Sequence, residues 1–186
     1  MDHLLARARR FDGAALTEIY EGLSPRLYRY AYRLLGEPCE AEDAVAEAFH
    51  RFLLALRNGG GPEAHVSAYL YRTVHNVITD RYRRRPVPDM PLDEALAAGE
   101  AADPAHAAAQ HIAAAHARAA LWRLTDDQRL VVMLKFFEGL DNEEVALALG
   151  KPAGAVKSLQ HRALEALRRL LAGELAEGKA RDEQLA

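Results

Sequence analysis

Apolar residues recur at three- and four-residue spacing along most of the chain, which is the pattern of amphipathic helices. The clearest case lies between residues 40 and 57, where acidic residues precede an apolar stripe. The stripe consists of Ala44, Val45, Ala48, Phe49, Phe52, Leu53 and Leu56. The sequence lacks stretches in which β-branched and polar residues alternate strictly, as half-buried strands require. The pattern therefore predicts an all-α fold.

Capping residues, glycines and prolines divide the first part of the chain into four predicted helices. Their approximate ranges are residues 12–22, 25–35, 40–57 and 66–84. Ser24 followed by Pro25 predicts a break between the first two, because serine is a good N-cap and proline is tolerated at the first helical position. Pro86 and Pro88 end the fourth helix. We expect these helices to form an N-terminal domain over residues 10–85.

An acidic segment follows the four helices. Residues 86–102 contain three prolines and four acidic residues but no lysine or arginine, which predicts a flexible linker. Further capping signals predict a second domain over residues 103–172. Its helices are expected at about residues 104–124, 126–137, 142–149 and 153–172. Residues 173–186 form a polar tail, so the chain divides into two small helical domains and an end that we expect to fray.

Residues 142–169 fit the demands of a helix-turn-helix. Ala146 is small where the second helix must cross the first, Gly150 accepts the positive φ of the turn, and Val156 supplies a buried apolar residue. An ordinary helical hairpin could share the glycine, but its outer face would be acidic or mixed. Here that face is basic, with Lys151, Lys157, Arg162, Arg168 and Arg169. We therefore expect the second helix to bind duplex DNA.

A second basic cluster ends the helix predicted at residues 66–84. It consists of four arginines within five positions, Arg81, Arg83, Arg84 and Arg85. Three tyrosines precede or interrupt it, Tyr69, Tyr71 and Tyr82. Aromatic rings beside arginines suit the stacking of unpaired bases and so favour single-stranded nucleic acid as a ligand. The alternative is that the tyrosines pack in the core, although four adjacent cations repel one another without an anionic partner.

The net charge of −3 argues against a uniformly basic nucleic-acid binder, so the distribution of charge matters more than its sum. The single cysteine, Cys39, cannot form an intramolecular disulfide, which fits a reducing compartment. The N-terminal segment MDHLLARARRFDG lacks the apolar core of a signal peptide, and the sequence has no apolar run long enough to span a bilayer. We therefore expect a cytoplasmic protein without membrane insertion.

Eight histidines raise the alternative of a metal-dependent enzyme. His106, His111 and His116 recur every five residues, which on a helix turns successive side chains through about 500° and scatters them off one face. The sequence also lacks an HExxH motif, a phosphate-binding glycine loop and a nucleophile elbow. We therefore expect no catalytic residue, no metal site and no cofactor.

Three ordered segments together resemble a known family. They are EAEDAVAEAF, YLYRTVHNVITDRYRRR and LWRLTDDQRLVVMLKFFEGLDNEEVALALGKPAGAVKSLQHRALEALRRLL. Their order and spacing are similar to those of small bacterial sigma-70 family factors, and the nearest type is the extracytoplasmic function (ECF) group. The likeness covers residues 10–172. It implies a sigma factor that binds core RNA polymerase and directs promoter recognition, melting and transcription initiation.

The resemblance implies a role for each segment. Core-polymerase binding falls on the helix expected at residues 40–57, with Glu40, Asp43, Glu47 and Phe49. Capture of the melted minus-ten strand falls on the next helix, with Tyr69, Arg72, His75, Asn76, Asp80, Arg81, Arg83 and Arg84. The loop at residues 58–65 resembles the loop that receives a flipped base. Reading of the duplex minus-thirty-five element falls on the second helix of the helix-turn-helix, with Lys157, Ser158, Gln160, His161 and Arg162.

The linker of the family threads toward the RNA exit path, and an anti-sigma factor is left open as a further partner. The chain departs from the family pattern at Ala46, Tyr69 and Leu159, where members often have glutamine, tryptophan and arginine. An alternative function is a helix-turn-helix regulator that acts without replacing a sigma subunit. It predicts duplex binding without polymerase, whereas family members usually bind promoters poorly alone.

Overall fold

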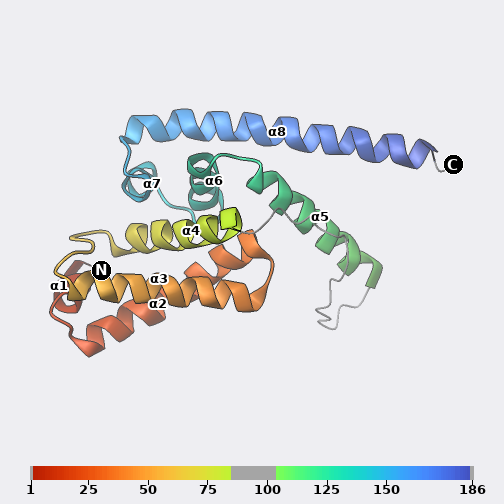
Figure 1. The fold of residues 1–186 in the computed structure, drawn as a ribbon. Coiled ribbons are helices and arrows are strands. Elements are labelled where there is room, and N and C mark those ends of the chain that lie inside the picture. Colours follow the sequence, from red (N-terminus) through yellow and green to blue (C-terminus); the bar gives the residue numbers. More distant parts are fainter. Residues whose placement is uncertain (1, 85–103, 185–186) are drawn as a thin grey trace.

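The computed structural model describes residues 2–84 and 104–184, and for residues 2, 104–109 and 173–184 it describes the backbone alone. Within these ranges all regular structure is helical (Figure 1), which confirms the predicted fold class. The elements are α1 (Asp2–Ala8), α2 (Gly13–Leu35), α3 (Pro38–Arg57), α4 (Val66–Arg84), α5 (Pro104–Trp122), α6 (Asp126–Val132), the π-helical turn η1 (Met133–Phe137), α7 (Asn142–Leu149) and α8 (Ala153–Gln184). The predicted linker at residues 86–102 lies outside the described residues.

Helices α1 to α4 form the first helical unit. α3 packs against both α2 and α4, and α1 packs against α2 (Figure 1). Each long helix buries one apolar face, and the largest fully buried side chains of this core include Leu27, Tyr30, Phe52, Leu70 and Ile78. This packing fixes how α4 is turned and therefore which of its polar side chains reach the surface.

α2 continues through Pro25, so the predicted helix break before this residue is wrong. A proline inside a helix loses one backbone hydrogen bond and crowds the preceding turn. The apolar stripe nevertheless stays in phase across it, and Ile19, Leu23, Leu27 and Tyr30 are all buried. Tertiary packing of this stripe supplies more stability than the proline removes, as is usual for helices in folded proteins.

Helices α5 to α8, with η1, form the second unit. Both predicted capping boxes are present, with Thr125 and Gln128 before α6 and Asp141 and Glu144 before α7. In each box the two side chains satisfy backbone N–H groups that have no partner within the helix. The first residues of α6 and α7 could therefore be predicted from the sequence.

Two helix boundaries in the second unit differ from the prediction. The helix expected through Phe137 changes at residue 133 into the π-helical turn η1. α8 continues to Gln184 instead of ending near residue 172. Residues 173–184 contain leucine, alanine, glutamate and lysine and no proline, so a helix can pass through the two glycines.

α7 and α8 form the predicted helix-turn-helix. Ala146 and Val156 are buried where the helices pack, and Gly150 has a φ of 65° in the turn. The Lys151 N–H donates to the Ala146 carbonyl at 3.0 Å, which closes the turn tightly. The prediction of this motif is confirmed: the small residue at the crossing, the left-handed glycine in the turn and the buried apolar residue are all present.

Gly150→Ala is expected to destabilise the protein by about 1–2 kcal/mol, because the left-handed conformation costs an L-residue that much. The added Cβ would also stand 2.8 Å from Nη1 of Arg72 on α4. Gly154→Ala is the matched control, since its added Cβ meets no atom within 4 Å. Thermal unfolding followed by circular dichroism should show a lower midpoint for the first variant only. Equal midpoints for the two variants would contradict a strained turn.

Candidate nucleic-acid interface

The first turns of α8 present a polar and basic surface. Four of the five predicted duplex-reading residues line one open groove, namely Lys157, Ser158, His161 and Arg162. Arg162 Nε donates to the Ser158 carbonyl at 3.3 Å, and His161 Nδ1 lies 3.6 Å from the Glu165 carboxylate. The fifth residue, Gln160, is half-buried. The groove offers the donors that DNA phosphates and base edges accept.

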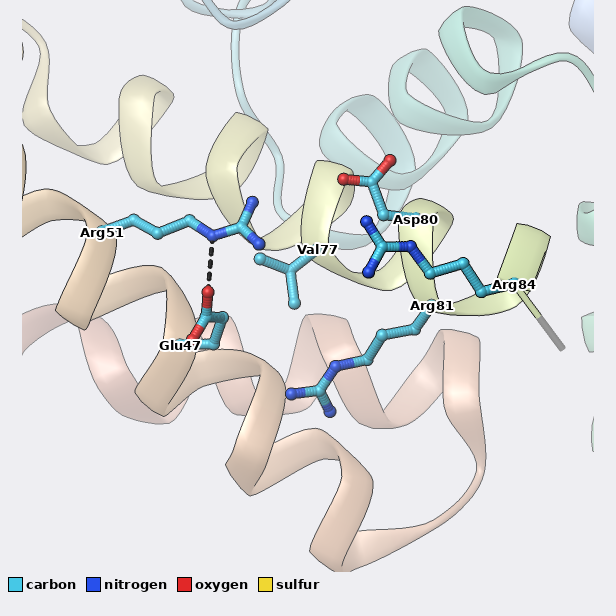
Figure 2. Close-up of a pocket in the computed structure, with 6 residues that line it drawn as sticks. All are labelled: Glu47, Arg51, Val77, Asp80, Arg81 and Arg84. Atoms are coloured by element: carbon cyan, nitrogen blue, oxygen red, sulfur yellow. Dashed lines mark hydrogen bonds and ion pairs between the residues drawn. The ribbon is translucent and has the colours of Figure 1, made fainter.

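A small pocket between α3 and α4 joins the two predicted sites of the first unit (Figure 2). Its lining residues are Glu47, Arg51, Val77, Asp80, Arg81 and Arg84. Arg51 donates to Glu47 at 2.7 Å, and this hydrogen bond lowers the pKa of the Glu47 carboxyl. Arg81 Nη1 lies 4.0 Å from the Asp43 carboxylate on α3. The predicted polymerase-binding carboxylates and minus-ten arginines are therefore neighbours.

The predicted core-binding residues of α3 differ in their accessibility. The Asp43 side chain is 74% exposed, and Glu40 and Glu47 are half-buried. Phe49 is only 7% exposed, and its ring centroid lies 4.8 Å from that of Tyr20 on α2. Phe49 therefore stabilises α3 against α2, and its position offers no surface for the predicted polymerase contact.

In this structure none of the three tyrosines of α4 is an unobstructed stacking platform. Tyr71 is fully buried. Its burial raises the pKa of its hydroxyl, and the hydrogen bond to Glu138 raises it further. Tyr69 is half-buried, with its ring centroid 6.0 Å from that of Phe52. Tyr82 is partly exposed but stacks on Trp122 of the second unit. The sequence had left a core role for these rings open.

His75 is buried, with 3% of its surface exposed, and does not face solvent as a DNA contact would. Its Nδ1 lies 2.7 Å from the Tyr30 hydroxyl. The pKa of His75 is lowered to about 4, mainly because the ring is buried and also because the Arg129 guanidinium repels a second positive charge. His75 is therefore neutral at pH 7. The predicted role in minus-ten binding is not available to it in this arrangement.

The second unit packs against one face of α4 and buries part of it. Arg72, His75, Thr79 and Arg83 follow at three- and four-residue spacing, so they share this face. α6 and α7 pack against α4. Arg83 forms an ion pair with Asp126 of α6, and the Arg72 guanidinium lies against the Gly150 turn. The remaining predicted residues lie outside this pattern: Asn76 and Arg84 are exposed, and Asp80 and Arg81 are half-buried.

Two residues at the contact between the units were not among the sequence candidates. Glu138 accepts hydrogen bonds from Arg33 and Tyr71, and Trp122 donates one to the Leu34 carbonyl. These partners lie 67 to 105 residues away in the chain. The residues next to them in the sequence give no signal for such contacts. Trp122 differs from other candidates only in being the single tryptophan of the chain.

Comparison with known proteins identifies both units. The family model described as Sigma-70 region 2 matches residues 19–86, and the model described as Sigma-70, region 4 matches residues 120–169. The chain is 30% identical to the ECF RNA polymerase sigma factor SigW of Bacillus subtilis, over 90% of this chain and 94% of that protein. It is 31% identical to the ECF RNA polymerase sigma factor BldN of Streptomyces coelicolor, over 92% of this chain and 66% of that protein.

The chain therefore belongs to the sigma-70 family of RNA polymerase sigma factors. Its curated relatives are sigma factors of the ECF group, as the sequence motifs had indicated. A sigma factor binds core RNA polymerase and promoter DNA and directs transcription initiation, and this is the function of the chain.

Two solved structures share the fold. One is CnrH in complex with the cytosolic domain of CnrY, with a TM-score of 0.68 and 23% identity over 92% of this chain and 97% of that one. The other is the sigma factor RpoE in complex with the anti-sigma factor NepR from Bartonella quintana, with a TM-score of 0.56 and 23% identity over 84% of this chain and 96% of that one. Both support the helical architecture described above.

Acid is expected to destabilise the protein through His75. An unfolded histidine binds a proton below about pH 6.5, whereas buried His75 binds one only below about pH 4. Between these values the unfolded state binds more protons, so stability falls as the pH drops through this window. The loss from this one residue between pH 7 and pH 5 is about 2 kcal/mol.

His75→Asn should remove this loss, because an amide oxygen can still accept from the Tyr30 hydroxyl but does not titrate. Urea unfolding of both proteins at pH 7 and pH 5 measures the difference. The wild type should lose more stability than the variant. Parallel losses would mean that His75 is not the group responsible.

Proposed function

We propose that the two units divide promoter recognition between them. The first unit, residues 10–85, binds core polymerase through α3 and the melted minus-ten strand through α4. The second unit, residues 103–172, binds the minus-thirty-five duplex through the first turns of α8. The observation that carries this assignment is the open basic groove of α8, set apart from the exposed carboxylate of Asp43 on α3. A basic groove suits phosphates, and an anionic helix suits a cationic protein surface.

The accessible minus-ten surface is smaller than the set predicted from the sequence. It comprises Arg72, Asn76, Asp80, Arg81, Arg83 and Arg84, which are at least partly exposed. Arginine and asparagine there can contact phosphates and the edges of unpaired bases. Arg83 of this set is paired with Asp126 of α6, and the neighbouring Tyr82 stacks on Trp122.

The loop at residues 58–65 receives a flipped base in this proposal. Gly59, Gly61 and His65 have φ values of 75°, 82° and 53°, so the loop is held in a conformation that most residues avoid. Arg9, which follows α1, donates to the carbonyls of Gly60 and Pro62 at 3.3 and 2.8 Å. A loop fixed in this way is pre-organised to receive a base without a further ordering cost.

The protein acts in the cytoplasm by binding alone and performs no covalent chemistry. Within the described residues, no group of three His, Cys, Asp or Glu side chains could hold a metal ion. The described helices include none that is both long and apolar enough to cross a bilayer. An anti-sigma factor is a further partner in this proposal, because one of the solved structures that share the fold is bound to such a protein.

The direct test is transcription in vitro with purified core polymerase and genomic DNA. Addition of the chain should create new transcript starts that share a motif upstream, because promoter choice then comes from this subunit. Gel shifts on such a promoter, with and without core polymerase, distinguish a sigma factor from a regulator that binds duplex DNA by itself. Binding of duplex by the chain alone, with no new transcript starts, would overturn the proposal in favour of that alternative.

Asp43→Ala is expected to lower the affinity for core polymerase by about two- to fivefold, the range for one exposed ion pair. The side chain is mostly solvent-exposed, so the far-ultraviolet circular dichroism should not change. Glu21→Ala is the control, because Glu21 is an exposed carboxylate on α2 outside the proposed surface. Affinity is measured by fluorescence anisotropy with labelled chain. Loss of helical signal in the Asp43 variant would show that the residue is structural.

A further inference from the structure

The turn between α1 and α2 holds a phenylalanine in a backbone conformation that favours glycine. Phe11 has a φ of 58°. The Asp12 N–H donates to the Arg7 carbonyl at 3.3 Å, and the Phe11 N–H donates to the Ala8 carbonyl at 2.9 Å. These two hydrogen bonds are those of a Schellman motif, whose left-handed residue is usually glycine because a Cβ is disfavoured there. Phenylalanine at this position therefore costs stability that glycine would not.

Burial of the Phe11 ring does not offset this cost. The residue is 47% exposed and is not part of the buried core. An apolar side chain that keeps half of its surface in water contributes much less to folding than a buried one. Bulky residues with a positive φ are uncommon, and strained residues cluster at functional sites. The exposed ring is therefore a candidate for binding rather than for folding.

The Arg9 side chain joins this turn to the loop at residues 58–65 (Figure 1). Its guanidinium donates to the carbonyls of Gly60 and Pro62. The loop contains three glycines and no phenylalanine, tyrosine or tryptophan, so it offers an unpaired base little surface for stacking. The turn at residues 9–12 thus brings an exposed aromatic ring to the loop that has none of these three.

A second strained ring lies at the end of the same loop. His65 has a φ of 53°, and it and Phe11 are the two non-glycine residues with positive φ in the part of the chain that the structure describes. Both are exposed. Two turns that one arginine joins therefore each hold an exposed ring in a conformation that most residues avoid. This coincidence favours a binding role that the two turns share.

The charge of the turn indicates the class of ligand. Arg7 pairs with Asp12, and Arg9 donates to the loop, whereas Arg10 is exposed to solvent. An exposed ring beside an exposed arginine suits an unpaired base and its phosphate. A duplex suits it less, because paired bases are stacked on one another and present no free face. The turn therefore favours single-stranded nucleic acid.

We propose that Phe11 stacks on an unpaired base of the DNA strand at the loop of residues 58–65, and that Arg10 contacts a phosphate beside that base. The turn between α1 and α2 then forms a part of the strand-binding surface that lies outside α4. This proposal rests on the proposed role of the loop as the receiver of a flipped base. Both side chains are exposed, so the contact requires no rearrangement of the chain.

Phe11→Gly and Phe11→Ala test the ring in the full-length chain. Both remove it, but glycine accepts the positive φ and alanine does not, so the glycine variant should unfold at the higher temperature of the two. Binding is measured by anisotropy with a fluorescein-labelled single-stranded thymidine homopolymer at low salt. Both variants should bind this strand at least about fivefold more weakly than the wild type, the lower end for the loss of one stacked base. Phe11→Tyr keeps the ring and should bind as the wild type does.

The glycine and alanine variants separate stacking from stability. If the ring acted only through folding, strand affinity would follow the unfolding temperature, and Phe11→Gly would bind more tightly than Phe11→Ala. That result would overturn the proposal, as would strand affinities equal to that of the wild type in both variants. A lower affinity for core polymerase with unchanged strand affinity would also overturn it, because the ring would then contact protein.

Arg10→Gln tests the phosphate contact independently of the ring. The slope of the logarithm of the strand-binding constant against the logarithm of the salt concentration should become shallower by about 0.7, the value for one phosphate contact with a single strand. Arg29→Gln is the matched control, since Arg29 is an exposed arginine on α2 outside this turn, and its slope should equal that of the wild type. An unchanged slope for Arg10→Gln would overturn the phosphate contact. Failure of the proposed function would instead appear as absent transcript starts with core polymerase.

Discussion

The burial of one side of α4 is the constraint on which the rest of the structure depends. Leu70, Val74, Val77 and Ile78 are buried in the core shared with α2 and α3, and this fixes the rotation of the helix. With that side fixed, the pocket beside α3 receives Arg81 and Arg84, while Arg83 is directed toward α6. One helix therefore takes part in the core, in the surface proposed for DNA and in the contact with the second unit.

Features set by residues close in the sequence were predictable. The turn of the helix-turn-helix follows from Gly150 and its spacing to Ala146 and Val156, because a left-handed residue and a close helix crossing are local demands. The capping boxes before α6 and α7 follow from side chains three residues apart. The open basic groove of α8 was also predictable, since helical spacing alone places Lys157 and Arg162 away from the buried Val156.

Features set by distant residues were not predictable. Pro25 lies within a continuous helix because packing with α3 and α4 outweighs a strong local signal. Phe49 and His75 were assigned to binding surfaces from the family resemblance, but whether they face solvent depends on α2 and on the second unit. Glu138 follows two exposed phenylalanines and carries no local sign that its carboxylate would be buried between two arginines. The sequence therefore assigned these surfaces to helices that the structure contains, but it could not show which of the assigned side chains are buried.

The net negative charge of the chain is compatible with binding DNA because its charge is unevenly distributed: some cations are paired internally, whereas those at the start of α8 face solvent. Asp126 takes the charge of Arg83, Asp127 lies 3.0 Å from Lys151, and Glu138 takes that of Arg33. The groove of α8 keeps its cations facing water, so its attraction for phosphate needs no rearrangement. On α4, by contrast, Arg83 is already paired with Asp126 of the second unit. Under the proposed division of promoter recognition, duplex contact by α8 can therefore precede strand contact by α4, because a DNA phosphate on α4 has to replace a carboxylate that is already there.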